Sequence, residues 1–143
     1  MFKGWIMRYI YLSDDFYNRH ATHTEIMQKR GRPYACLAVQ IQGVTFAIPM
    51  RHHITHSYCY RTIGDCGLDY TKAVVVEKED IGQGTPQIAQ AEFNIIKKHE
   101  TVIINGMRKY VALYIKATER RSPFYDGIRK YSALQYFEDK IKR

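Results

Sequence analysis

The most regular pattern of apolar and polar positions lies near the middle of the chain. Two apolar runs, Tyr34–Ile41 and Val44–Pro49, are separated only by Gln42 and Gly43. In the second run apolar residues fall at alternate positions, which is the period of a strand with one buried face. A two-residue break that contains glycine between two such runs predicts a β-hairpin.

Other strand patterns also lie before the long helical pattern. Arg8–Leu12 is typical of a strand, and the apolar run Ala73–Val76 predicts a strand buried on both faces. Ser57–Thr62 is either a short strand or an ordered loop. Because strands cluster early and do not alternate with helices, the pattern predicts an α+β domain with an antiparallel sheet.

Helical patterns are of two kinds, short and long. Ser13 predicts the N-cap of a first short helix, and Thr22 or Thr24 predicts the cap of a second through residues 25–29. Glu92–Thr118 has one apolar and one basic sector at helical spacing, with a break expected near residues 99–101.

The long helical pattern separates its apolar residues from its basic residues. The apolar positions of the long pattern are Phe93, Ile96, Ile103, Met107, Tyr110, Val111 and Tyr114. Its basic positions include Lys97, Lys98, Arg108, Lys109 and Lys116. The basic sector is either an ordinary solvated face or a track for an RNA backbone. Phe124–Ile141 predicts a C-terminal amphipathic helix.

Size and composition narrow the class of protein. A chain of 143 residues with 45% hydrophobic residues suits one domain, residues 1–143, with 1–6 as a possible N-terminal extension because Met7 is an equally good start. No apolar run reaches the roughly 20 residues of a membrane span. The three cysteines form no CxxC pair, and Cys36 is expected in the core, so we expect a reducing cytoplasm.

Charge adds a candidate partner. The net charge is +8 and the chain has 12 tyrosines. Cations neutralise phosphates and aromatic rings stack on bases, so this combination suits nucleic acid. Tyr34, Tyr58, Tyr60 and Tyr70 are either stacking platforms or core residues with surface hydroxyls.

The segment directly after the hairpin holds the candidate chemistry: Arg51, His52, His53 and His56. His53 and His56 have a spacing that suits one metal ion, but no cysteine or carboxylate cluster completes a site and Arg51 repels cations, so we expect no metal. A structural role for loop histidines in hydrogen bonds to the backbone is the second interpretation.

Acid–base cleavage of RNA is the third interpretation. The ribose 2′-hydroxyl must lose a proton and the 5′ oxygen must gain one, and histidine does either near neutral pH. Charge that builds on the phosphate needs cationic donors, which Arg32, Arg51 and Lys72 can supply if their strands are neighbours. Lys72, after Thr71, is otherwise a solvent-facing lysine.

Five blocks of sequence carry a resemblance to a known family. They are RPY at 32–34, IQGVTFAIPMRHHITH at 41–56, GLDYTKAVVV at 67–76, AEFNIIKKHE at 91–100 and GMRKYVALY at 106–114. In this order they resemble the toxins of type III toxin–antitoxin systems. The chain is similar to the CptN and TenpN branches and more distantly to the ToxN/AbiQ branch, over roughly residues 8–137.

The resemblance implies a fold, an activity and partners. It implies a metal-independent, cofactor-free bacterial endoribonuclease with a highly twisted antiparallel sheet flanked by helices, related to the MazF/Kid-like toxins. Cleavage of cellular or phage RNA would leave a 2′,3′-cyclic phosphate. The inhibitor would be an antitoxin RNA pseudoknot, cut by the toxin from a tandem-repeat transcript and held in a closed protein–RNA hetero-oligomer. Some such systems act in phage defence by abortive infection.

The resemblance also assigns roles to residues. Arg32 falls where the ToxN branch has an active-site lysine, and Arg51 and His52 fall where it has hydroxyl residues. We expect Arg51 and Lys72 to stabilise the phosphate, His52 or His53 to carry the proton and Arg32 to position the phosphate. The predicted RNA-binding residues are Tyr34, His56, Thr71, Lys97, Lys98, Arg108, Lys109 and Lys116. A non-catalytic RNA-binding module and a protein-interaction domain that uses the C-terminal helix remain as alternatives.

Overall fold

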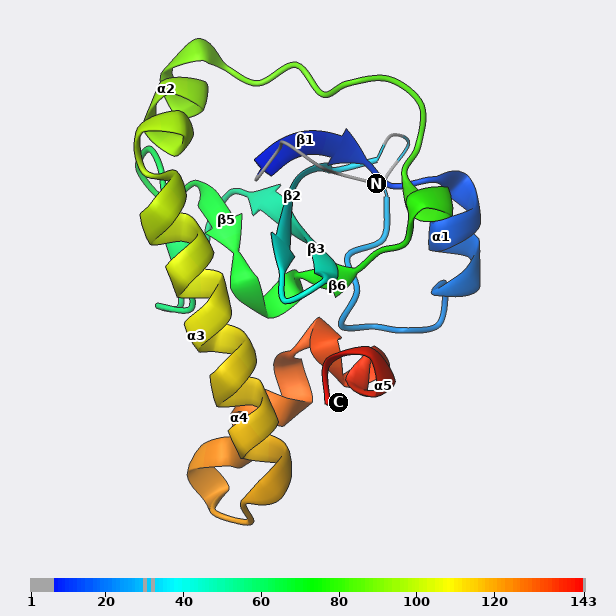
Figure 1. Ribbon diagram of the computed structural model, residues 1–143, viewed down its shortest axis with the longest axis vertical. Helices are drawn as coiled ribbons and strands as arrows, with labels where there is room; N and C mark the ends of the chain where they lie inside the picture. Colours follow the sequence, from blue (N-terminus) through cyan, green and yellow to red (C-terminus); the bar gives the residue numbers. More distant parts are fainter. Residues whose placement is uncertain (1–6, 30, 32, 143) are drawn as a thin grey trace.

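The protein is an α+β domain built on a six-stranded antiparallel sheet, as the sequence predicts (Figure 1). The computed structural model describes residues 7–29, 31 and 33–142. The strands are β1 (Met7–Tyr11), β2 (Ala35–Ile41), β3 (Val44–Arg51), β4 (Cys59–Arg61), β5 (Gly67–Asp69) and β6 (Val74–Val75). Their order is β1-β2-β3-β5-β4, and β6 also pairs with β3.

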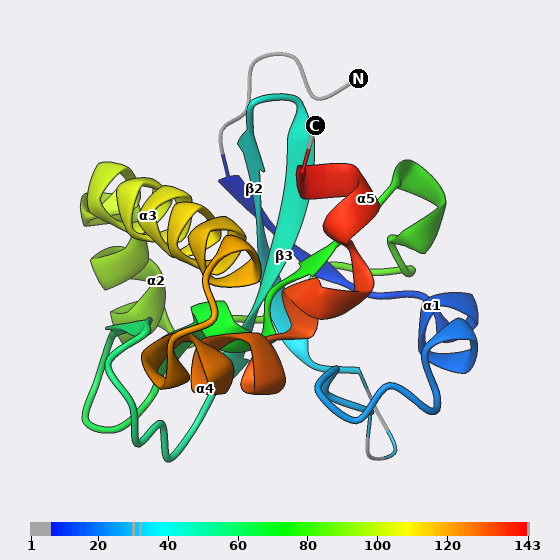
Figure 2. The ribbon, with the colours of Figure 1, turned by 90° about the horizontal axis from the view of Figure 1, so that it is seen from below.

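Helices flank this sheet. The α-helices are α1 (Asp14–Arg19), α2 (Gln90–Lys98), α3 (Glu100–Glu119), α4 (Pro123–Tyr131) and α5 (Glu138–Ile141). Three 3₁₀ turns, η1 (Tyr70–Lys72), η2 (Lys78–Asp80) and η3 (Ala133–Tyr136), connect other elements. Figure 2 shows α2 and α3 on one side of the β2–β3 hairpin and α1 on the other, with the C-terminal segment between them.

The central hairpin has the predicted strands and turn. β2 and β3 pair from Cys36 opposite Pro49 to Ile41 opposite Val44. Gln42 and Gly43 have φ angles of 51° and 79°, the left-handed pair that a type I′ turn requires. Because this turn matches the twist of the strands, it fixes the register that buries the hairpin in the core.

One edge of β3 holds two separate strands, and this fork brings the candidate residues together. The middle of β3 pairs with β6, where Ala47 lies opposite Val74. Its end pairs with β5, where Arg51 lies opposite Gly67. The η1 turn connects β5 to β6, so Arg51 at the end of β3 lies beside the segment that contains Lys72.

The long helical pattern breaks where the sequence predicts. α2 ends at Lys98 and α3 begins at Glu100, with His99 between them at φ −117° and ψ 29°. The buried face of α3 consists of Ile103, Met107, Tyr110, Tyr114 and Ala117. Gly106 is needed for packing, because a Cβ there would lie 2.4 Å from the Tyr70 hydroxyl. That hydroxyl donates to the Ile103 carbonyl at 2.9 Å.

The predicted second short helix at residues 25–29 is wrong. A turn and a bend cover residues 24–26, and residues 27–29 have no regular secondary structure. The Thr24 hydroxyl donates to the Glu25 carboxylate, so it does not cap a helix. The Gln28 side chain donates to the carbonyls of His20 and Ile26, which satisfies these groups outside a helix.

Two other predicted elements are shorter than expected. Ala73–Val76 is buried as predicted, but only Val74 and Val75 form a strand because turns precede and follow it. The C-terminal pattern is not one helix. Ser132 has an extended backbone, and its hydroxyl accepts from the Leu134 amide, so it separates α4 from η3.

Two further observations concern the buried cysteine and the length of the helices. Cys36 is buried as predicted, and its burial raises the pKa of the thiol to about 12. Within the described residues, no helix combines the length and the apolarity needed to cross a membrane.

Candidate functional site

A fully buried carboxylate, that of Asp69, lies at the centre of the candidate site. Its Oδ2 lies 2.6 Å from an Arg51 guanidinium nitrogen. Its Oδ1 accepts from the Thr71 amide at 2.9 Å and from the Thr71 hydroxyl at 2.6 Å. His56 Nε2 lies 3.2 Å from the same oxygen. A buried charge needs such a set of partners, and here they connect β3, η1 and the loop between them.

His56 has protein partners at both ring nitrogens. Nδ1 accepts from the backbone amide of Tyr58 at 3.1 Å. Since a backbone amide only donates, Nδ1 carries no proton in this arrangement, and Nε2 carries the proton that faces Asp69. The ring is therefore held in one tautomer and acts as an orienting group for the loop.

Lys72 is the second cation of the site. It ends η1, and its ammonium donates to the carbonyl of Tyr131, the last residue of α4, at 3.0 Å. Burial lowers the pKa of Lys72, and the Arg51 charge lowers it further, while Asp69 and Glu25 oppose the shift. A lysine with a lowered pKa gives up its proton more readily than a solvent-exposed one.

A pocket of about 400 Å³ connects these groups. Its lining comes from β3, the loop before β4, η1, α3 and α4: Arg51, His56, Tyr58, Thr71, Lys72, Tyr110, Phe124, Gly127, Ile128 and Tyr131. Burial raises the pKa of the Tyr110 hydroxyl to about 12, so this phenol stays protonated at neutral pH. The pocket thus combines two cations with aromatic and aliphatic walls.

The tandem histidines lie outside this pocket lining. His52 Nδ1 lies 3.0 Å from the Cys66 sulfur. His53 has a left-handed backbone, with φ 58°, and its Nδ1 lies 2.6 Å from the Asp65 carboxylate. The candidate residues at the end of β3 and in the following loop therefore divide into two groups. Arg51 and His56 face Asp69, whereas His52 and His53 face Cys66 and Asp65, just before β5.

The remaining predicted residues are dispersed. Arg32 lies outside the described residues. Tyr34 is half-buried and lines, with Lys72, a second and much narrower cavity. The predicted basic residues on α2 and α3 are all exposed: Lys97, Lys98, Arg108, Lys109 and Lys116. The Thr71 hydroxyl is used by Asp69, and Tyr70 is a core residue, so its stacking interpretation is wrong.

Sequence reasoning missed Asp69 and the contribution of α4. A signal for Asp69 was present, because an aspartate two residues before a threonine favours the turn that its side chain forms here. A signal for α4 was also present. Phe124 and Tyr131 are seven residues apart, which places them on one face of a helix.

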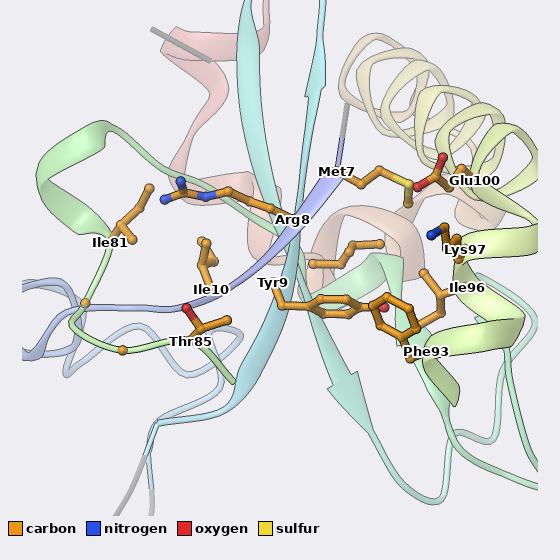
Figure 3. A pocket seen from close by; sticks show the side chains of 13 residues that line it. Met7, Arg8, Tyr9, Ile10, Ile81, Thr85, Phe93, Ile96, Lys97 and Glu100 are labelled. Atoms are coloured by element: carbon orange, nitrogen blue, oxygen red, sulfur yellow. The ribbon is translucent and has the colours of Figure 1, made fainter. Parts of the chain in front are cut away.

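A larger cavity, of about 470 Å³, lies at another place (Figure 3). It opens between β1, residues 81–85 and α2, with Tyr9 and Phe93 rings 6.0 Å apart at one side. Its charged groups, Arg8, Lys97 and Glu100, are at least partly exposed. We place the candidate site in the smaller pocket, because there a buried carboxylate fixes the position of a cation.

His53 and His56, the pair with metal-ligand spacing, contact the different carboxylates of Asp65 and Asp69. Across the described part of the chain, no three His, Cys, Asp or Glu side chains gather in a group that could hold an ion.

Comparisons of the chain with models of protein families, with curated proteins and with solved structures find no match. A functional assignment therefore depends on the chemistry of the site and on the sequence resemblance.

Proposed function

We propose that this protein is a metal-independent endoribonuclease whose active site is the pocket lined by Arg51 and Lys72. One observation carries the proposal. Two cations 21 positions apart in the chain line one pocket with aromatic walls, and buried Asp69 holds the first of them in place. Cations aimed at a phosphate stabilise the charge that develops on it during cleavage, and preorganised ones do so without reorganisation.

Cleavage would follow the in-line attack of the ribose 2′ oxygen on the adjacent phosphorus. The bond from phosphorus to the 5′ oxygen breaks, and a 2′,3′-cyclic phosphate remains. Arg51 binds the non-bridging oxygens, and the Lys72 ammonium gives its proton to the departing 5′ oxygen. Water accepts the proton of the 2′-hydroxyl, because both nitrogens of His56 have protein partners.

His52 and His53 are the alternative proton carriers in this proposal. Neither lines the pocket, and each has a partner at the turn before β5. The two versions differ in a direct way. If Lys72 donates the proton, the double replacement of His52 and His53 by alanine leaves cleavage intact, whereas a histidine mechanism loses it.

The biological setting follows from the sequence resemblance. The proposal is a type III toxin with a fold related to the MazF/Kid-like toxins, acting in the bacterial cytoplasm. Its antitoxin RNA pseudoknot would inhibit it in a closed protein–RNA hetero-oligomer, and cellular or phage RNA would be its substrate. The net charge of +8 and the exposed lysines of α2 and α3 support an RNA partner.

The test is RNA cleavage by the purified chain in the presence of EDTA, with mass spectrometry of the products. We expect cyclic phosphate ends. We expect loss of about 100-fold or more in rate for Arg51→Ala, the size of effect seen when one transition-state donor is removed. Lys78→Ala, an exposed lysine of η2 that neither lines the pocket nor belongs to the predicted RNA-binding residues, is the matched control. RNA that remains intact with the wild-type protein would overturn the proposal.

A non-catalytic RNA-binding module is the second candidate. The engaged nitrogens of His56 favour it, because they leave no imidazole of the pocket open to act as a base. It predicts salt-sensitive RNA binding that Arg51→Ala and Lys72→Ala weaken, with no cleavage under any condition.

A further inference from the structure

Helix α4 places two large aromatic side chains at the pocket in an exposed position. Phe124 is 63% and Tyr131 is 60% exposed, and both line the pocket. Within the described residues they are two of only four large hydrophobic side chains with such exposure. The Lys130 ammonium lies 5.5 Å from the centre of the Tyr131 ring. Exposed apolar surface that gathers at one pocket is typical of a ligand-binding groove, so the position of these rings points to a ligand.

Gly127, between these two residues, leaves space where a side chain would stand. A Cβ built at Gly127 would meet no atom within 4 Å, although this residue lines the pocket. The rings of Tyr58 and Tyr110, which also line the pocket, lie 5.9 Å apart. The α4 part of the lining therefore consists of two exposed rings, the buried Ile128 and an open position at Gly127.

We propose that α4 forms a wall that holds one unpaired nucleobase of the RNA, next to the phosphate that Arg51 and Lys72 contact. The inference rests on the proposed function and adds the part of the substrate that enters the pocket. A flat ring suits the aromatic walls, and the adjacent cations suit the phosphate of the same nucleotide. Stacking of this kind changes RNA affinity by about 5- to 150-fold per base when the ring is removed.

Two polar groups of the pocket have protein partners, and this limits how the base is selected. The Thr71 hydroxyl donates to Asp69, and the Lys72 ammonium donates to the Tyr131 carbonyl. The walls read the face of the base by stacking, so we expect selection for unpaired over paired nucleotides. We expect a weaker preference for purines, which have the larger stacking surface.

Filling the gap at Gly127 tests the inference without touching the cations. Gly127 shares a helix face with Phe124 and Tyr131, so Gly127→Leu should place a side chain at the pocket from a helical position that favours leucine over glycine. We expect binding of a fluorescently labelled, unpaired RNA decamer to weaken at least 10-fold in anisotropy titrations at fixed salt. Gly127→Ala, which adds one methyl group, should bind nearly as the wild type. Both variants should melt at or above the wild-type temperature.

Ring removal gives an independent arm. Phe124→Ala and Tyr131→Ala should each weaken binding of the decamer by about 5- to 150-fold. Val102→Ala, which removes an exposed apolar side chain from α3, should not. A duplex of the same sequence should bind all of these variants as it binds the wild type.

The outcomes separate this inference from the proposed function. If Gly127→Leu binds and cleaves the decamer as the wild type does while Arg51→Ala is inactive, the base wall is wrong and the nuclease stands. If the wild-type protein binds the decamer without cleaving it and Gly127→Leu weakens binding, the wall stands and the nuclease is wrong. If the wild-type protein does not bind the decamer, both are wrong.

Discussion

The Arg51 guanidinium lies 2.6 Å from the carboxylate of Asp69, which has no exposure to solvent. This contact joins the end of β3 to the last residue of β5, which is also the N-cap of η1. Because the carboxylate also accepts from the Thr71 amide and hydroxyl, its position is fixed from two sides. Arg51 is held in turn, so the pair couples the stability of the fork in the sheet to the geometry of the pocket.

Removal of the Asp69 charge should affect both stability and activity. Asp69→Asn keeps the size of the side chain but leaves Arg51 without a buried counter-charge. It also places an amide nitrogen, which only donates, where a carboxylate oxygen accepts a hydrogen bond. We expect a loss of about 1–3 kcal/mol in the free energy of unfolding, the cost of unsatisfied buried partners. Urea denaturation measures it, and the RNA assay should show reduced cleavage. Asp65→Asn, at an exposed carboxylate, should leave the urea midpoint nearly unchanged.

Two glycines inside helices should respond to alanine in opposite ways. At Gly106 of α3 a Cβ would lie 2.4 Å from the buried Tyr70 hydroxyl, whereas at Gly127 of α4 it would meet nothing within 4 Å. Overpacking costs about 1–3 kcal/mol, and the helix preference of alanine over glycine returns up to about 1 kcal/mol. We expect Gly106→Ala to lower the free energy of unfolding and Gly127→Ala to raise it. Equal effects would contradict the packing described for Tyr70.

Stability should fall as the pH drops below about 7, because of His20. Burial lowers the pKa of His20 from 6.5, and the charges of His23 and Arg19 lower it further, against Asp80. The folded protein then binds fewer protons than the unfolded chain as the pH falls through 6.5. The contribution of His20 to the free energy of unfolding is therefore complete above this pH and is lost progressively below it.

The test compares urea denaturation at pH 7.5 and pH 5.5. The His20 ring packs 4.4 Å from the Phe16 ring, so His20→Phe keeps an aromatic group while removing the titration. We expect a smaller loss of stability between the two pH values in this variant. His53→Asn is the control, because asparagine tolerates the left-handed backbone of this exposed position. A pH dependence unchanged by His20→Phe would assign the effect to another group.

The pH profile of cleavage should identify the proton donor. The pKa of Lys72 is lowered from 10.5 by burial. The rate should rise with pH as the 2′-hydroxyl loses its proton more readily. It should level off or decrease once Lys72 has lost its own proton, which we expect at a pH below 10.5. Lys72→Arg keeps the positive charge but cannot give up its proton in this range, and should remove the alkaline limb. An identical profile in Lys72→Arg would exclude Lys72 as the donor.

Much of the fold was predictable because local rules agree with tertiary packing. The hairpin follows from two apolar runs and a Gln42-Gly43 turn, and the helix break follows from Glu100 falling outside the polar face. The second short helix was wrong because Thr24 bonds a neighbouring side chain. That choice depends on competition between local hydrogen bonds, which spacing does not decide.

The candidate site was predictable in part for a related reason. Arg51 and Lys72 could be paired from the sequence once their strands were taken as neighbours. The side to which each histidine points could not, because it depends on the left-handed backbone of His53. The spacing of Phe124 and Tyr131 indicates a shared helix face, but not that this face lines the pocket, since the Lys72–Tyr131 contact joins residues 59 positions apart.

The Lys72–Tyr131 hydrogen bond links a positive charge of the pocket to the end of helix α4. The Tyr131 carbonyl is the final acceptor of α4, and the ammonium that satisfies it is one that a polyanion would also attract. A phosphate that draws Lys72 away leaves the helix end without this partner, so occupancy and the seating of α4 become thermodynamically coupled. The binding of a phosphate and the position of α4 would therefore depend on the same lysine, Lys72.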